Sequence, residues 1–160
     1  MAEAAEGAEL LGAQLHALDN PLTPEAVGAL IVGLRPEVVI THPTADVHPD
    51  HRATAEAVLA AVPEAVISSG FPRRLYTCDS YNSLTLTGPL PPAVIIDITA
   101  TYLLKMQALA AHSATQPISD HFGPMANILA RLWGARIGTE YGEPFTRVPI
   151  LGRLPRATRL

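Results

Sequence analysis

Apolar residues recur at helical spacing in two stretches near the start of the chain. Residues 2–12 are rich in Ala, Glu and Leu and predict a helix. A second helix is predicted after Thr23, a good N-cap, with Pro24 in its first turn. Its apolar residues share one face of a helix, namely Val27, Leu30, Ile31 and Leu34. Between the two helices, Gln14–Leu18 is a short candidate strand.

An uninterrupted apolar run follows the second helix. Residues 37–41, Glu-Val-Val-Ile-Thr, do not alternate with polar residues, which favours a strand buried on both faces of a parallel sheet. A polar loop leads from this strand to a helix that begins near Pro49. The apolar face predicted for that helix contains Ala55, Val58, Leu59 and Val62. This alternation of helices and strands favours a doubly wound α/β fold.

The second half of the chain has a less regular pattern. It predicts strands at Arg74–Cys78, Ala93–Ile98 and Tyr141–Val148. One helix is expected from Thr99 to Ala111 and another from Pro124. The predicted core faces are Leu103, Met106 and Ala110 on the first helix, and Met125, Ile128, Leu129, Leu132 and Trp133 on the second.

Length and composition fit one soluble domain over residues 1–160. Apolar residues make up 48% of the chain and charged residues only 16%, so the chain can build a core and global disorder is excluded. A net charge of −4 gives no general attraction to nucleic acids or acidic membranes. We therefore expect no nucleic-acid partner. The longest apolar runs, such as AVGALIVGL, are far too short to span a membrane, so no membrane span is expected.

The sequence around the start and the single cysteine indicate a cytoplasmic protein. The first residues are acidic and lack the basic segment of a signal peptide. Cys78 is the only cysteine, so the chain has no internal disulfide, which fits a reducing compartment. A lone cysteine is more typical of a small buried hydrophobe than of a nucleophile.

Three histidines and two aspartates gather directly after the strand at 37–41. These residues are His42, Asp46, His48, Asp50 and His51. Ligands of open α/β sheets bind at this place, outside the carboxyl ends of the strands. His48 and His51 are three residues apart and can share one face of a helical turn. Imidazole can ligate zinc or act as an acid, and a carboxylate can orient a histidine. The alternative is that these groups only cap a helix and bond to one another; their density favours a site.

The same segment resembles a motif of the PIG-L/LmbE family of zinc-dependent N-deacetylases. VVITHPTADVHPDHRATAEAV is similar to the family's strand-THxxxDxHPDHR-helix segment. Residues 96–113, IDITATYLLKMQALAAHS, and residues 140–145, EYGEPF, resemble later family segments. Residues 3–12 also look like a family helix, so the resemblance covers nearly the whole chain. It implies a Rossmann-like, doubly wound, mostly parallel sheet with helices on both faces.

The resemblance implies hydrolysis of the N-acetyl group of an N-acetylglucosamine-type sugar conjugate, a small molecule. Zinc would activate water and polarise the carbonyl. By the match of motifs, His51 is the zinc ligand. His48 stabilises the oxyanion or protonates the leaving amine, and Asp50 supports His48. The candidate substrate-binding residues are Asp46, Arg52 and His112.

The sequence departs from the family at its start. The family motif H-P-D-D-E, which supplies two zinc ligands and a general base, has no counterpart here, nor does the N-terminal βαβ part. The start of the sequence could be internal to a longer protein, a separate or cleaved chain could complete the domain, or the protein could be a remnant. His16, His112 and His121 are candidate replacement ligands.

The family resemblance thus favours an enzyme, but the missing H-P-D-D-E motif leaves open whether this chain is active. The alternative is a non-catalytic or truncated module that binds a partner chain or a ligand without turnover. The absence of the family's central strand also raises the expectation of a homo-oligomer or a complementing chain.

Overall fold

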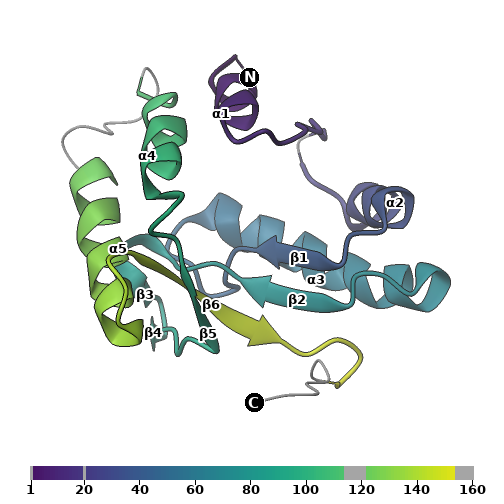
Figure 1. Cartoon of the computed structure of the whole chain (residues 1–160). Helices are drawn as coiled ribbons and strands as arrows, with labels where there is room; N and C mark the ends of the chain where they lie inside the picture. The colour runs from purple at the N-terminus through teal and green to yellow at the C-terminus, as the bar shows by residue number, and fades with distance from the viewer. Residues whose placement is uncertain (1, 20, 114–121, 154–160) are drawn as a thin grey trace. The chain divides into compact units, whose positions relative to one another are not determined.

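The computed structural model describes residues 2–19, 21–113 and 122–153 (Figure 1). The chain forms two compact units. Unit 1 comprises Met1–Ala17 and Ile95–Glu143, and unit 2 comprises Leu18–Val94 and Pro144–Leu160. The organisation as a single domain over residues 1–160 stays a prediction.

Unit 2 contains the helices and strands predicted for the first half of the chain. They are α2 (Pro24–Leu34), β1 (Val38–Thr41), α3 (Pro49–Ser69) and β2 (Arg74–Thr77). After them come a single 3₁₀ turn, η1 (Tyr81–Ser83), and a small hairpin of β3 (Leu84–Thr85) and β4 (Gly88–Pro89).

Local chemistry fixes the ends of α2 as the sequence predicts. The Thr23 hydroxyl accepts a hydrogen bond from the Ala26 N–H at 3.2 Å, and Pro24 occupies the first turn. The helix stops at Arg35, whose left-handed conformation (φ 50°) lets its N–H bond the Ile31 carbonyl.

The core of unit 2 is aliphatic and lies where α2, α3 and β2 meet. Val27 and Ile31 from α2 and Leu75 from β2 belong to it. The contribution of α3 consists mostly of small residues, Ala57, Val58, Ala61, Val62 and Ala65. Small side chains let the two helices pack closely, and the burial of Val58 and Val62 confirms the face predicted for α3.

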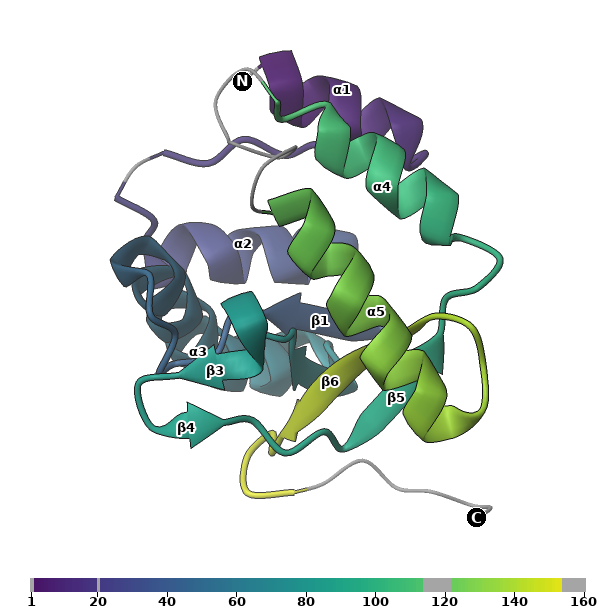
Figure 2. The ribbon, with the colours of Figure 1, turned by 90° about the vertical axis from the view of Figure 1, so that its left-hand side faces the viewer.

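The described part of unit 1 contains the helices α1 (Ala2–Leu10), α4 (Tyr102–Ala110) and α5 (Gly123–Ile137). Figure 2 shows α1 and α4 side by side. The core is aromatic in part, because the rings of Tyr102 and Tyr141 stack with centroids 3.7 Å apart. Ile98 and Ala130 pack with them.

The remaining strands are β5 (Val94–Asp97) and β6 (Gly142–Val148), and the sheet has the order β1-β2-β6-β5. β1 and β2 are parallel, with Thr41 opposite Thr77, whereas β2 and β6 are antiparallel. The α/β class is confirmed, with a sheet of mixed strand direction. Within the described residues β1 lies at the edge of this sheet and Ile40 is exposed, so the prediction that this strand is buried on both faces is wrong.

One predicted strand is wrong. Gln14–Leu18 has no regular structure, and Leu15 and Leu18 are exposed. A strand of this length needs a neighbouring backbone for its hydrogen bonds, and within the described residues none pairs with it.

The predicted core faces of α4 and α5 are also wrong in part. On α4 the buried residues are Tyr102 and Ala108, while Leu103 is 75% exposed. On α5 they are Ala130, Trp133 and Gly134, while Ile128 and Leu132 are exposed. Both helices are apolar around most of their circumference, so periodicity does not select a face. None of the described helices has the length and apolar character needed to cross a membrane.

Candidate functional site

Asp46 is the buried centre of the loop between β1 and α3. Its side chain is only 2% exposed. Oδ1 accepts a hydrogen bond from the His48 backbone N–H at 2.8 Å and lies 3.2 Å from Nδ1 of His51. A buried carboxylate requires such partners, because an isolated charge would be costly to remove from water. Asp46 therefore ties the loop to the first turn of α3.

Arg52 holds the same loop from the other side of the turn. Its guanidinium donates hydrogen bonds to the Asp46 carbonyl at 2.8 Å and to the Val47 carbonyl at 3.1 Å. These bonds use a side chain from the first turn of α3 to fix two loop carbonyls. The contacts give Arg52 a positioning role, and its predicted contact with substrate stays a prediction.

His48 is the N-cap of α3. Its Nδ1 accepts a hydrogen bond from the Asp50 backbone N–H at 3.2 Å. Because Nδ1 accepts, the neutral ring carries its proton on Nε2. The Asp50 carboxylate lies 4.0 Å from Nδ1 and is 89% exposed. The N-terminal end of a helix also favours negative charge. His48 thus offers an Nε2–H donor beside a site that attracts anions.

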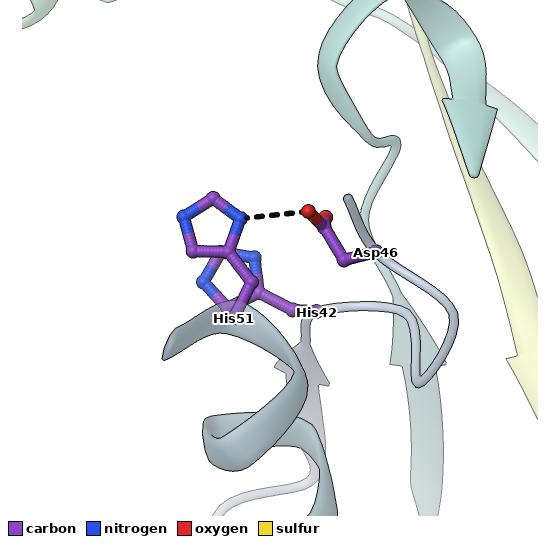
Figure 3. Close-up of side chains that lie close together, drawn as sticks. All are labelled: His42, Asp46 and His51. Atoms are coloured by element: carbon purple, nitrogen blue, oxygen red, sulfur yellow. Dashed lines mark ion pairs between the residues drawn. The ribbon is translucent and has the colours of Figure 1, made fainter. Parts of the chain in front are cut away.

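His51 lies one turn further along α3 and stacks on His42, which follows β1. The two ring centroids are 3.9 Å apart and the planes differ by 5°. Figure 3 shows that each ring turns one nitrogen towards Asp46. The His48 ring is also close, with its centroid 4.7 Å from that of His51. The side chains of His42, Asp46, His48 and His51 therefore lie close together at the turn between β1 and α3.

His42, Asp46 and His51 have the donor chemistry of a metal site. One nitrogen of each histidine and one carboxylate oxygen lie within 4.8 Å of one another. Two nitrogens and an oxygen are a normal ligand set for zinc. The lone pairs of the stacked rings lie in parallel planes, so one ring must tilt before both histidines can share an ion. With that rotation the donors fit; we refer to these three residues as the histidine–aspartate cluster.

The environment of His42 favours its neutral form. Burial lowers the pKa of His42 below its ordinary value of 6.5, and the nearby His51 and His48 act in the same direction. Asp46 opposes this change. A neutral imidazole has the lone pair that a metal ion needs.

Five of the predicted site residues lie together in unit 2. His48, Asp50, His51, Asp46 and Arg52 all lie at the β1–α3 turn of unit 2. His112 lies in unit 1, at the end of α4, where its Nε2 is 3.4 Å from the position of a Cβ at Gly7. His121 lies outside the described residues.

His42 belongs to the cluster of histidines and aspartates that the sequence indicated, but no ligand role was predicted for it. The motif comparison assigned the ligand role to His51 alone. The signal available was the position of His42 directly after the strand predicted at 37–41. That position puts a side chain at the carboxyl edge of the sheet, beside the start of the next helix.

Solved structures with this fold were found, whereas no protein-family model and no curated protein matches the sequence. The chain is similar to the conserved protein TT1542 of Thermus thermophilus, with 25% identity and a TM-score of 0.76 over 98% of this chain and 74% of that one. It is also similar to the 4-carboxy-2-hydroxymuconate hydratase GalB of Pseudomonas putida, with 18% identity and a TM-score of 0.75 over 99% of this chain and 72% of that one.

A third similar structure is the N,N'-diacetylchitobiose deacetylase of Pyrococcus horikoshii. Identity is 24% and the TM-score is 0.66, over 92% of this chain and 62% of that one. The likeness to the hydratase and to the deacetylase shows the fold alone. Because one fold serves both a hydratase and a deacetylase, the reaction must be argued from the site.

Proposed function

We propose that this chain is a zinc-dependent hydrolase that removes the N-acetyl group from an N-acetylglucosamine-type sugar conjugate. The single observation that carries the proposal is the convergence of the histidine–aspartate cluster with the Nε2–H donor of His48. The resemblance of residues 41–52 to the deacetylase motif supports it. The deacetylases among proteins of similar fold agree with it.

The proposed zinc ligands are His42, Asp46 and His51. This extends the ligand role predicted for His51 and gives Asp46 a metal contact in place of a substrate contact. Three protein donors leave a fourth position open, which is the arrangement of catalytic zinc sites. When bound, zinc would supply Lewis acidity at the amide carbonyl.

His48 is the proposed proton donor. The Asp50 N–H occupies Nδ1, so the proton on Nε2 is the one that can reach substrate. That donor can hydrogen-bond the oxygen of an amide as negative charge develops, and can then protonate the leaving amine. Asp50 supports His48 through its backbone N–H, and its carboxylate lies 4.0 Å from Nδ1.

Asp46 and Arg52 position the other groups. Asp46 binds the backbone of His48 and the ring of His51 at once, so it fixes the spacing of proton donor and metal ligand. Arg52 holds the loop carbonyls that precede them. The arrangement therefore needs no contribution from unit 1 to bring these two histidines together.

The test is to measure zinc content and acetate release with a panel of N-acetylglucosamine conjugates. We expect roughly stoichiometric zinc in the natural chain and its loss in His51→Ala. His48→Asn is the matched variant, because asparagine is a good N-cap but cannot donate as imidazole does. It should keep its zinc and lose about 10²–10⁴-fold in turnover.

Two results would contradict the proposal. The first is failure to bind zinc at micromolar concentrations, and the second is absence of acetate release from every conjugate by zinc-loaded protein. Loss of zinc in His48→Asn would overturn the division of roles between His48 and His51.

A non-catalytic module that binds a partner polypeptide is the second candidate, favoured by the edge of β1. This strand ends the sheet within the described residues, and Ile40 on it is exposed. An apolar edge strand is a template for pairing with another strand. This candidate would be favoured if the zinc-loaded protein showed no activity but formed a stable complex with an added polypeptide that pairs with β1.

A further inference from the structure

The register of β1 and β2 brings the only cysteine of the chain to the histidine–aspartate cluster. Thr41 and Thr77 are opposite each other at the ends of two parallel strands. The next residues are His42 and Cys78, so the same register places them side by side. The Cys78 N–H donates to the Thr41 carbonyl at 2.9 Å, which holds the cysteine backbone against β1.

The side chains of these two residues are in contact. Sγ of Cys78 lies 3.9 Å from Nδ1 of His42. Cys78 is half-buried, not fully enclosed in apolar core as its isolation in the sequence suggested. The nitrogen that touches the thiol belongs to one of the three residues already able to share a metal ion.

We propose that Cys78 is the fourth donor of this metal site, as a thiolate, together with His42, Asp46 and His51. The inference rests on the proposed function for the site itself and adds a ligand to it. On metal binding, a metal–sulfur bond forms, the S–H bond breaks, and the proton passes to solvent. No electron is transferred.

Two donor–donor separations are close to those that a shared ion requires. Zinc bonds at tetrahedral angles hold a nitrogen and an oxygen about 3.3 Å apart, and a nitrogen and a sulfur about 3.5 Å apart. The corresponding distances are 3.2 Å between His51 Nδ1 and Asp46 Oδ1, and 3.9 Å between His42 Nδ1 and Cys78 Sγ. These two pairs are therefore within about half an ångström of the spacing that a shared ion requires, and Sγ must still move closer to the other two residues of the cluster.

A thiolate changes which ions the site selects. Sulfur ligands favour zinc and other thiophilic ions over magnesium and calcium, which prefer oxygen. Four protein donors also fill a tetrahedral site, so Cys78 occupies the position that a three-ligand site leaves open. With the thiolate bound the metal centre is closed, so turnover would require the thiolate to leave or the ion to accept a fifth ligand.

Cobalt(II) is the probe that reports sulfur coordination directly. Chelator-treated full chain is titrated with Co²⁺ in the presence of excess Mg²⁺ while the absorption spectrum is recorded. We expect a near-ultraviolet thiolate-to-cobalt charge-transfer band together with visible bands of a tetrahedral ion. In Cys78→Ser the charge-transfer band should vanish, and affinity should fall at least about tenfold, the loss typical even for indirect partners of ligands.

Glu64→Gln is the control variant, because it removes an exposed carboxylate of α3 outside the cluster and should leave both spectrum and affinity unchanged. A second measurement uses the unsubstituted chain, so it does not depend on whether Cys78→Ser folds. Reaction of the Cys78 thiol with an aromatic disulfide reagent should slow at least about tenfold when Co²⁺ is bound.

The outcomes separate this inference from the proposed function. Tight Co²⁺ binding without a charge-transfer band, and with an unprotected thiol, would overturn the role of Cys78 and leave a three-ligand site intact. Absence of Co²⁺ binding would overturn both proposals. A charge-transfer band in chain that never releases acetate would uphold the cysteine ligand and contradict the deacetylase.

Discussion

The two units build their cores from different side chains. Unit 2 packs the small and branched aliphatic residues of α3 against α2 and β2. Unit 1 packs a stacked tyrosine pair and few aliphatic residues, while Leu103, Ile128 and Leu132 remain exposed. The apolar pattern predicted the face of α3 in unit 2 and misplaced the faces of α4 and α5 in unit 1. Periodicity therefore identifies a core face only where apolar residues occupy one side of a helix.

The comparison predicts unequal effects for the same substitution in the two units. Leu75 in unit 2 is 1% exposed, so Leu75→Ala leaves a cavity and should lower the free energy of unfolding by about 2–5 kcal/mol. Leu103 in unit 1 is exposed, so Leu103→Ala should change it by no more than about 0.5 kcal/mol. Urea unfolding followed by circular dichroism measures both. Equal losses would show that Leu103 is buried in solution.

Two helical glycines offer a smaller contrast. A Cβ at Gly134 of α5 would lie 2.8 Å from backbone atoms of Glu140 and Thr139, so Gly134→Ala should cost about 1–3 kcal/mol. A Cβ at Gly33 of α2 meets nothing within 4 Å, so Gly33→Ala should stabilise by about 0.5–1 kcal/mol through the helix preference of alanine. Thermal unfolding of both variants tests this pair, and a neutral Gly134→Ala would refute the close approach.

The smallest expected effect is a pH dependence of opposite sign in the two units. Burial lowers the pKa of His42, so the unfolded chain binds the proton more readily and stability falls as pH drops below 6.5. Burial raises the pKa of Tyr102, so the unfolded chain ionises first and stability falls as pH rises above 10. We expect this in a plot of the free energy of unfolding against pH, measured on metal-free protein. His42→Gln should reduce the fall in stability at acid pH, and Tyr102→Phe should reduce the fall at alkaline pH. An unchanged limb in either variant would assign that slope to another group.

Most elements of the fold were predictable because their signals are local. Thr23 and Pro24 mark the start of α2, and the apolar run at 37–41 predicts β1. Gln14–Leu18 failed because a strand depends on a partner backbone that local sequence does not reveal. The antiparallel pairing of β6 with β2 was likewise beyond reach, since strand order is a long-range property.

In the candidate site, too, some residues are brought together by local sequence and others only by the tertiary fold. His48 and His51 are close because they share the first turn of α3, so their spacing in the sequence already predicted their proximity. His42 joins them only through the fold of the loop that Asp46 and Arg52 hold. Cys78 is 36 residues away from His42 in sequence.

By itself, the sequence determined the α/β class, the starts of α2 and α3 and the location of the candidate site after the first strand. The tertiary structure decided which faces of α4 and α5 are buried, which residues complete the histidine–aspartate cluster, and that Cys78 lies beside it. The physical reason is that capping and helical spacing act over a few residues. Strand register and side-chain packing depend on contacts between segments far apart in the chain.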